Sequence, residues 1–177
     1  METTTKSSAI NYGLYLGGIL ALATILVYAI KLELFTSVIL GVVLFVITIT
    51  LGIISLIKSK KIQNGFISFK EAFTSYFITV LIGIVISSLI SFVIFNFVDP
   101  EAAVQLKELA LDSQVEMLRN FNQPEETIAL MVEASEKQGN LFSIGNVFTS
   151  LIGYIIFYSI IGLIIALILK KNPETVE

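Results

Sequence analysis

The sequence predicts an all-α, polytopic membrane protein with four transmembrane helices and an extracytoplasmic helical hairpin between the third and the fourth. Two observations lead to this fold class. Of the 177 residues, 55% are hydrophobic and only 14% are charged, about half the charged fraction of a typical soluble domain. The charged residues are also unevenly placed, because four stretches of at least 20 residues contain no Asp, Glu, Lys or Arg.

Each uncharged stretch is long enough to cross a bilayer as a helix, since about 20 apolar residues span the hydrocarbon layer. Within that layer the backbone must satisfy its own hydrogen bonds, and a helix does so inside one segment. The expected spans cover residues 10–30, 34–57, 73–98 and 147–169. They divide the chain into residues 1–98 with the loop 58–72, the segment 99–140, and residues 141–177 with the last span and a tail.

The first span contains two small residues, Ala21 and Ala23, at the spacing of a signal-peptide cleavage site. The apolar stretch nevertheless continues without interruption to Ile30, which is longer than the apolar core of a signal peptide requires. We therefore expect this segment to be retained as a membrane-spanning helix.

The lysines predict the orientation. The loop 58–72 and the two tails contain seven basic residues, whereas the other two connections contain four basic and ten acidic residues. Basic residues concentrate on the cytoplasmic side of membrane proteins. We therefore expect a multi-pass protein of the bacterial cytoplasmic (inner) membrane with both termini in the cytoplasm. The seven lysines are Lys6, Lys58, Lys60, Lys61, Lys70, Lys170 and Lys171.

The loop 58–72 ends with a helix-start signal. Ser68 and Glu71 have the spacing of a capping box, in which the two side chains bind free backbone amides at a helix N-terminus. Phe66 and Phe69 suit the headgroup boundary of the bilayer, where they would anchor the third span. The alternative interpretation makes these phenylalanines a docking edge for a partner.

The segment 99–140 contains nine acidic and three basic residues, a net charge of −6. Asp99, Pro100 and Glu101 match the N-cap, first position and first turn of a helix. The pattern breaks near Asn120, and Pro124 begins a second helical segment that ends before Gly139. We therefore predict two helices in a hairpin; a solvated, partly flexible loop is the alternative.

The first hairpin helix carries a stripe of apolar residues. The second helix is too short to bury all of them, so the remainder must contact the membrane surface or another protein. The acidic faces would repel anionic headgroups, so a protein contact is the preferred cover. The candidate partner-contact residues are Val104, Leu111, Val115 and Leu118, together with Phe66 and Phe69 at the other side of the membrane.

The composition excludes most membrane chemistry. The chain contains no Cys and no His, which removes thiol nucleophiles, thiolate and imidazole metal ligands, and the commonest general base. The spans contain no ionisable acid or base of the kind that couples transport to protons or ions. The net charge of −3 gives no electrostatic footprint for nucleic acid. We expect a non-enzyme with no cofactor, no metal ion and no nucleic-acid partner.

Small residues recur along single faces of the spans. Such stripes allow helix backbones to approach closely, within one chain or between chains. Packing inside this chain is the simpler interpretation, because four spans are enough for a self-contained bundle. The candidate helix-packing residues are Gly13, Gly17, Gly52, Gly83, Ser87 and Gly162.

Three features resemble one bacterial family. They are residues 65–73 (Gly-Phe-Ile-Ser-Phe-Lys-Glu-Ala-Phe), residues 96–100 (Asn-Phe-Val-Asp-Pro), and an acidic insertion before a last span that ends in two lysines. The chain resembles the domain of unknown function 4199 family, integral membrane proteins of Bacteroidota. The resemblance implies four spans with an outer helical insertion, and an accessory role beside a polyprenyl-phosphate glycosyltransferase.

Two function classes follow. The preferred hypothesis is a non-catalytic scaffold or accessory subunit that binds another membrane protein or a second copy of itself in the lipid bilayer. The alternative is a passive transporter of a lipid or small solute, with a polar lining made of Ser87, Ser88, Ser91 and Asn96.

Overall fold

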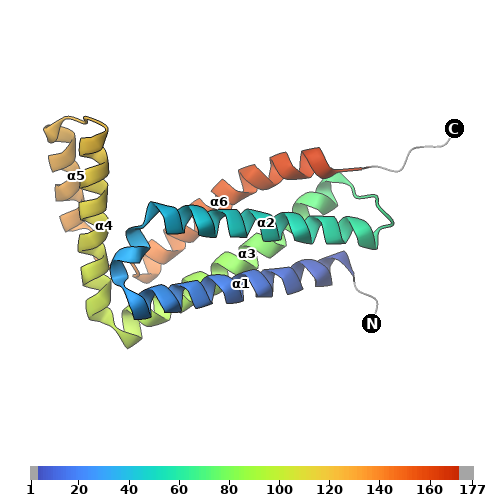
Figure 1. The fold of residues 1–177 in the computed structure, drawn as a ribbon, viewed down its shortest axis with the longest axis horizontal. Helices are drawn as coiled ribbons and strands as arrows, with labels where there is room; N and C mark the ends of the chain where they lie inside the picture. The colour runs from blue at the N-terminus through green and yellow to red at the C-terminus, as the bar shows by residue number, and fades with distance from the viewer. Residues whose placement is uncertain (1–3, 172–177) are drawn as a thin grey trace.

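A computed structural model describes residues 4–171, and four of its helices are long and apolar enough to cross a membrane (Figure 1). The predicted fold class, an all-α polytopic membrane protein, is confirmed. Residues 1–3 and 172–177, assigned above to the cytoplasmic tails, lie outside the described residues. In chain order the elements are α1 (Thr5–Ile30), the 3₁₀ helix η1 (Leu32–Thr36), α2 (Val38–Ile62), α3 (Phe69–Val93), the π-helical turn η2 (Ile94–Val98), α4 (Pro100–Asn120), α5 (Glu125–Lys137) and α6 (Ile144–Leu169).

The helix ends differ from the ends of the apolar stretches, because polar capping residues decide where a helix begins. The N-caps of α1, α3 and α6 are Thr4, Ser68 and Ser143. These three helices therefore begin a few residues before the expected span starts at residues 10, 73 and 147. The second long helix begins at Val38 and not at residue 34, where the uncharged stretch begins. Residues 32–36 form η1, and α2 begins only after the cap at Ser37.

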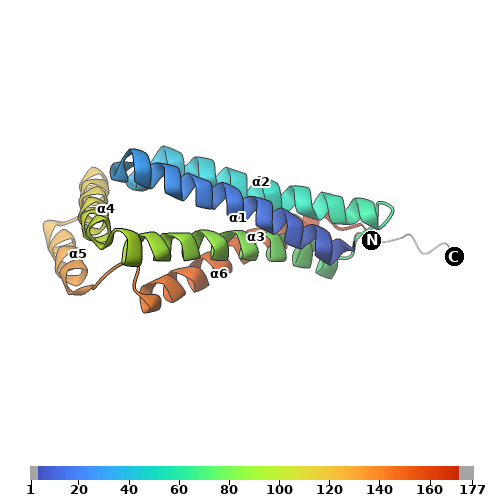
Figure 2. The same ribbon diagram turned by 90° about the horizontal axis from the view of Figure 1, so that it is seen from below.

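α3 is the central helix, and it packs against each of the other three long helices. Figure 2 shows α1 and α2 as one layer above α3 and α6. α6 packs almost entirely on α3, and only Gly162 and Ala166 of its residues are buried. A helix that is apolar on all sides and exposed in this way is typical of a span that faces lipid.

α1 and α3 approach closely where each helix presents a glycine to a branched side chain of the other. A Cβ added to Gly17 would lie 2.5 Å from Cδ1 of Ile86, and one added to Gly83 would lie 2.5 Å from Cδ2 of Leu16. Gly18, the next residue of α1, has no atom within 4 Å of the equivalent position. Backbone proximity at Gly17 and Gly83 therefore depends on the missing side chains.

Tyr76 of α3 occupies a slot between α2 and α6, and its side chain is fully buried. A Cβ added to Gly52 would lie 2.5 Å from Cε2 of its ring, and one added to Gly162 would lie 2.5 Å from Cδ1. Glycines on two different helices therefore make room for this one aromatic ring.

Hydroxyl groups connect the first three long helices. Thr79 Oγ1 lies 2.7 Å from Ser55 Oγ and 3.0 Å from the carbonyl oxygen of Ala9. Ser75 Oγ donates to Ser59 Oγ at 2.9 Å. All four hydroxyl-bearing side chains are buried, and interhelical bonds of this kind stabilise membrane bundles modestly.

The end of α6 is tied to the connection between α2 and α3. Ile67 and Lys171 exchange two backbone hydrogen bonds of 2.8 and 2.9 Å, and Lys60 Nζ donates to the carbonyl oxygen of Leu169 at 2.8 Å. The predicted capping box is confirmed, because Ser68 Oγ accepts from the Glu71 amide and the Glu71 carboxylate accepts from the Ser68 amide.

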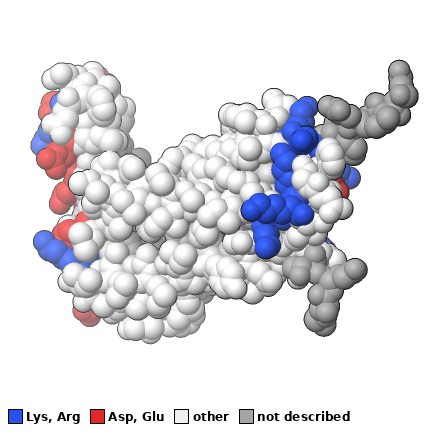
Figure 3. All heavy atoms as spheres, turned by 45° about the vertical axis from the view of Figure 1, so that its right-hand side comes forward, with Lys and Arg blue, Asp and Glu red and all other residues white. Residues whose placement is uncertain are grey.

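Charged side chains lie at the two ends of the molecule, with an uncharged belt between them on the face shown in Figure 3. Lysines gather at the end that holds the α2–α3 connection and the two chain termini. The acidic residues of α4 and α5 lie at the opposite end. For the rest of the text these are called the lysine end and the acidic end.

Candidate functional site

The candidate site is the pair α4 and α5, called here the end unit (residues 100–137), together with its junction to the bundle. α4 crosses the acidic end of the bundle at a steep angle to the four long helices, and α5 lies beside it (Figures 1 and 2). The two predicted helix starts are confirmed: Asp99 caps α4 with Pro100 in the first turn, and α5 begins at Glu125 after Pro124.

A π-helical turn precedes the end unit. In this turn the Asp99 amide donates to the carbonyl oxygen of Ile94 at 2.8 Å. Single π turns at the ends of helices recur at functional positions. Here the turn holds Phe95, which is fully buried, and Asn96, which is partly buried.

Phe95 is the centre of an aromatic cluster that packs against the first turns of α4. Its ring stacks on Phe142 with the centroids 4.1 Å apart, and it meets Tyr28 and Phe35 edge to face at 6.1 and 5.6 Å. Aromatic pairs in these geometries contribute about 0.5–1.5 kcal/mol beyond simple burial. The α4 residues packed in the same cluster are Ala102, Ala103 and Leu106.

Asn96 connects the end of α3 with the start of α6. Its side-chain amide donates to the carbonyl oxygens of Phe92 and Phe142, both at 2.9 Å, and its side-chain oxygen accepts from Asn140 at 3.2 Å. Asn146 Nδ2 in turn donates to the Asn140 carbonyl oxygen at 2.8 Å. The side chain proposed above as transporter lining therefore has a structural role at the junction.

Beyond its base the end unit is loosely packed. Ile128 is the one buried residue of α5, and a groove of about 320 Å³ separates the two helices. Lys107 Nζ donates to the carbonyl oxygen of Gln138 across this groove. All eight carboxylates within α4 and α5 are exposed.

The six predicted partner-contact residues do not form one surface. Val104 is 60% exposed, Leu111 lines the groove between α4 and α5, and Val115 and Leu118 are partly exposed. Phe66 and Phe69 belong to the lysine end, so the bundle separates them from the other four (Figure 1).

At the lysine end, Phe66 is partly covered within the chain. The ammonium group of Lys171 lies 5.5 Å from the centroid of its ring, within cation–π range. Phe69 is 39% exposed, in the first turn of α3. This environment fits the anchoring interpretation of both phenylalanines better than the docking interpretation.

Sequence reasoning missed the two most exposed large apolar residues of the end unit. Phe121 is 69% exposed and Leu130 is 62% exposed. Phe121 lies in the break between the two helices, where periodicity gives no signal. Leu130 lies on the outward side of α5, opposite the apolar positions that the helical pattern selects.

The candidate helix-packing residues fall into two contact groups. Gly13, Gly17 and Gly83 lie at the α1–α3 contact, and Gly52 and Gly162 lie on Tyr76. Ser87 is partly buried on α3. Each of the five glycines faces another helix of this chain, which supports the internal-packing interpretation.

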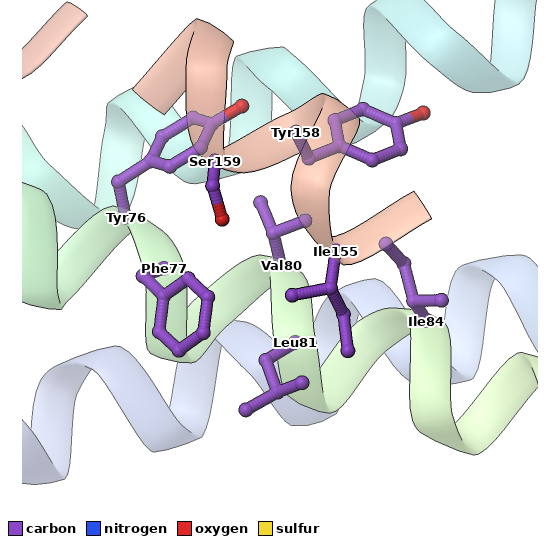
Figure 4. Close-up of a pocket in the computed structure, with 8 residues that line it drawn as sticks. All are labelled: Tyr76, Phe77, Val80, Leu81, Ile84, Ile155, Tyr158 and Ser159. Carbon is purple, nitrogen blue, oxygen red and sulfur yellow. The ribbon is translucent and has the colours of Figure 1, made fainter. Parts of the chain in front are cut away.

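The cavity beside Tyr76, within the helix bundle, is too small for a transported molecule. Tyr76 Oη has no hydrogen-bond partner among the described residues, and the Tyr76 side chain lines a cavity of about 10 Å³ between α3 and α6. A cavity of that size holds about one water molecule, far less than a lipid or solute needs. The lining residues, shown in Figure 4, are Tyr76, Phe77, Val80, Leu81, Ile84, Ile155, Tyr158 and Ser159.

Within residues 4–171, no three His, Cys, Asp or Glu side chains are grouped closely enough to hold a metal ion. The described carboxylates of α4 and α5 instead form two exposed ion pairs. Arg119 lies 3.6 Å from Glu125, and Lys137 lies 2.6 Å from Glu133. Exposed pairs of this kind contribute little to stability.

Comparison with known proteins places the chain in a family. The profile of a family described as "Protein of unknown function (DUF4199)" matches residues 11–171. No curated protein and no solved structure gives a significant match. The match covers α1 from residue 11 onward, the other three long helices and the whole end unit. The chain therefore belongs to the DUF4199 family of proteins of unknown function.

Proposed function

We propose that this protein is a non-catalytic accessory subunit or scaffold of an assembly in a bacterial inner membrane. In this proposal the lysine end and both termini are cytoplasmic, and the end unit docks on another membrane protein outside the cytoplasm. The distribution of lysines supports the orientation.

The observation that carries the proposal is a contrast within the end unit. The start of α4 is packed firmly on the bundle, whereas the opposite end of the α4–α5 pair exposes large apolar side chains. The base is held by the Phe95 cluster and by the Asn96 hydrogen bonds. The far part exposes Phe121, Leu130 and Met117, the last at 50%. A helix pair that is held at its base and exposes large apolar side chains beyond it is typical of a protein-binding surface.

The charge of the end unit indicates what kind of partner fits. Eight exposed carboxylates lie on the same two helices as the exposed apolar residues, so a partner that combines basic and apolar side chains is complementary. The same carboxylates disfavour contact with anionic lipid. The family resemblance suggests a polyprenyl-phosphate glycosyltransferase as the first partner to test.

Site-specific photo-crosslinking in cells tests the proposal. A photoreactive amino acid at Phe121 or Leu130 should crosslink to one protein of constant mass. The same amino acid at Leu26, which is 56% exposed on α1, should crosslink to lipid instead. The F121D substitution, which replaces an exposed apolar ring with a carboxylate, should abolish the protein crosslink formed from position 130 while leaving the melting temperature of the purified protein unchanged.

Crosslinks from positions 121 and 130 to lipid alone would contradict the proposal and favour an end unit that rests on the membrane surface. The transporter alternative is tested on the purified protein in liposomes. If a homogeneous preparation without a partner moves a lipid or solute across the bilayer, the accessory role is wrong.

A further inference from the structure

We propose that a groove between the N-terminal parts of α1 and α3 binds the headgroup of an anionic membrane phospholipid. The groove has a volume of about 620 Å³ and lies at the lysine end, where α1 and α3 begin. It is lined by residues of α1, of α3 and by Ser68, the residue that caps α3. The end unit is at the other end of the molecule, so this site is independent of the proposed docking function.

The rim of the groove is positively charged. Lys6 of α1 and Lys70 of α3 both line it. Neither lysine takes part in an ion pair among the described residues, where every pair involves another cation. Glu71 also lines the groove, but its carboxylate accepts from the amide and the hydroxyl group of Ser68 at 3.0 and 2.7 Å. The rim therefore carries two ammonium groups and one carboxylate, a net charge of +1, and the Glu71 carboxylate is turned toward the helix start by its hydrogen bonds with Ser68.

Polar backbone and hydroxyl groups add to the attraction for an anion. α1 and α3 both begin at this groove, and their N-caps Thr4 and Ser68 each bind one backbone amide. The amides of Phe69 and Lys70 make no hydrogen bond with another described residue. Free amides and the helix dipole favour negative charge at such ends.

Along α1 and α3 the lining changes from charged residues at the helix starts to uncharged residues further in, namely Ala9, Thr74, Ser75 and Ile78. Lys6 and Lys70 lie near the helix starts, and Ala9 and Ile78 lie one to two turns further into the bundle. A phospholipid has the same order of groups, with a charged phosphodiester above its acyl chains. A soluble phosphate ion would match the rim but would leave the apolar part of the groove empty, so the lining favours a lipid.

The test uses the purified full-length protein in neutral detergent. Added phosphatidylglycerol should raise its melting temperature and leave one lipid bound in native mass spectrometry, whereas phosphatidylcholine should do neither. A lysine near an anionic lipid surface contributes about a fivefold gain in affinity. The K6Q/K70Q double variant should therefore bind phosphatidylglycerol roughly 30-fold more weakly.

Two matched controls separate the groove from general charge. The K58Q/K61Q variant removes two lysines of the same end that do not line the groove, and it should keep most of the affinity. Thr74→Trp should fill the groove without changing its charge and abolish the bound lipid. Leu89→Trp, at an exposed position of α3, should have no effect.

Three results would overturn the proposal. If K6Q/K70Q and K58Q/K61Q weaken phosphatidylglycerol binding equally, the lipid is attracted by the overall charge of the lysine end and not by the groove. Undiminished lipid binding in the Thr74→Trp variant would place the lipid elsewhere. Stabilisation by inorganic phosphate as large as that by phosphatidylglycerol would show that the acyl chains, and hence the lipid, are not required.

Discussion

Tyr28 Oη donates a hydrogen bond of 3.0 Å to Asp99 Oδ2, although the two residues are 71 positions apart in the chain. The other oxygen of the same carboxylate, Oδ1, accepts from the amide of Ala102 at 2.9 Å and so caps α4. One carboxylate therefore ties the end of α1 to the start of α4. The direction of the end unit is set by the bundle rather than by the connection alone.

Replacing Asp99 with Ala should loosen α4 at its base. Loss of an N-cap costs about 0.5–2 kcal/mol, and the Tyr28 hydroxyl loses its partner as well. Hydrogen exchange should therefore become faster at the amides of residues 101–106. Asp112→Ala removes an exposed carboxylate of the same helix and serves as the control. Unchanged exchange in the D99A variant would show that the aromatic cluster alone fixes α4.

Replacing Gly17 with Leu should destabilise the bundle, whereas Gly18→Leu should not. A side chain at Gly17 meets Ile86 of α3, and one at Gly18 meets open space. Overpacking of this kind costs about 1–3 kcal/mol. Thermal unfolding in detergent measures the difference. Equal melting temperatures for the two variants would mean that α1 and α3 separate at low cost.

Replacing Tyr76 with Phe should maintain or raise the stability of the protein. The ring still fills the slot between Gly52 and Gly162, and a buried hydroxyl that lacks a partner among the described residues is removed. An unsatisfied buried polar group costs about 1–3 kcal/mol. Tyr15→Phe, at a 64% exposed position, is the control. A clear fall in melting temperature for Y76F alone would reveal a bound water or other partner of the hydroxyl.

Replacing Thr79 with Val should destabilise the bundle more than Thr24→Val. Thr79 contacts Ser55 and Ala9 on two other helices, whereas Thr24 donates only to Leu20 within its own helix. Interhelical hydrogen bonds in membrane proteins contribute about 0.6 kcal/mol on average and about 1.7 at most. Equal free energies of unfolding for the two variants would assign the hydroxyl cluster no role in holding the helices together.

Cysteine labelling should show the lysine end in the cytoplasm. The chain has no natural cysteine, so single cysteines at positions 61 and 112, both exposed, report without background. In intact cells an impermeant maleimide should label position 112 and leave position 61 unmodified until the membrane is opened. The reverse pattern would invert the orientation proposed here.

Several features of the fold follow from the sequence because they depend on residues close together in the chain. Uncharged stretches longer than the bilayer is thick can only become helices in lipid. Asp99 with Pro100, and Ser68 with Glu71, are local capping signals, and the structure shows both caps. Apolar content does not distinguish a 3₁₀ turn from an α-helix, so the sequence does not show that α2 begins at Val38 rather than at residue 34.

The candidate sites depend on contacts between distant residues, which a single sequence does not reveal. The spacing of Gly52 and Gly162 shows that each can lie at a helix contact, but not that both face the ring of Tyr76. Similarly, the groove at the lysine end exists only because α1 and α3 start side by side. Membrane insertion is decided by local hydrophobicity, so the sequence alone determined the spans. Which helix packs on which depends on shape matching between separate helices, so only the tertiary structure decided the sites.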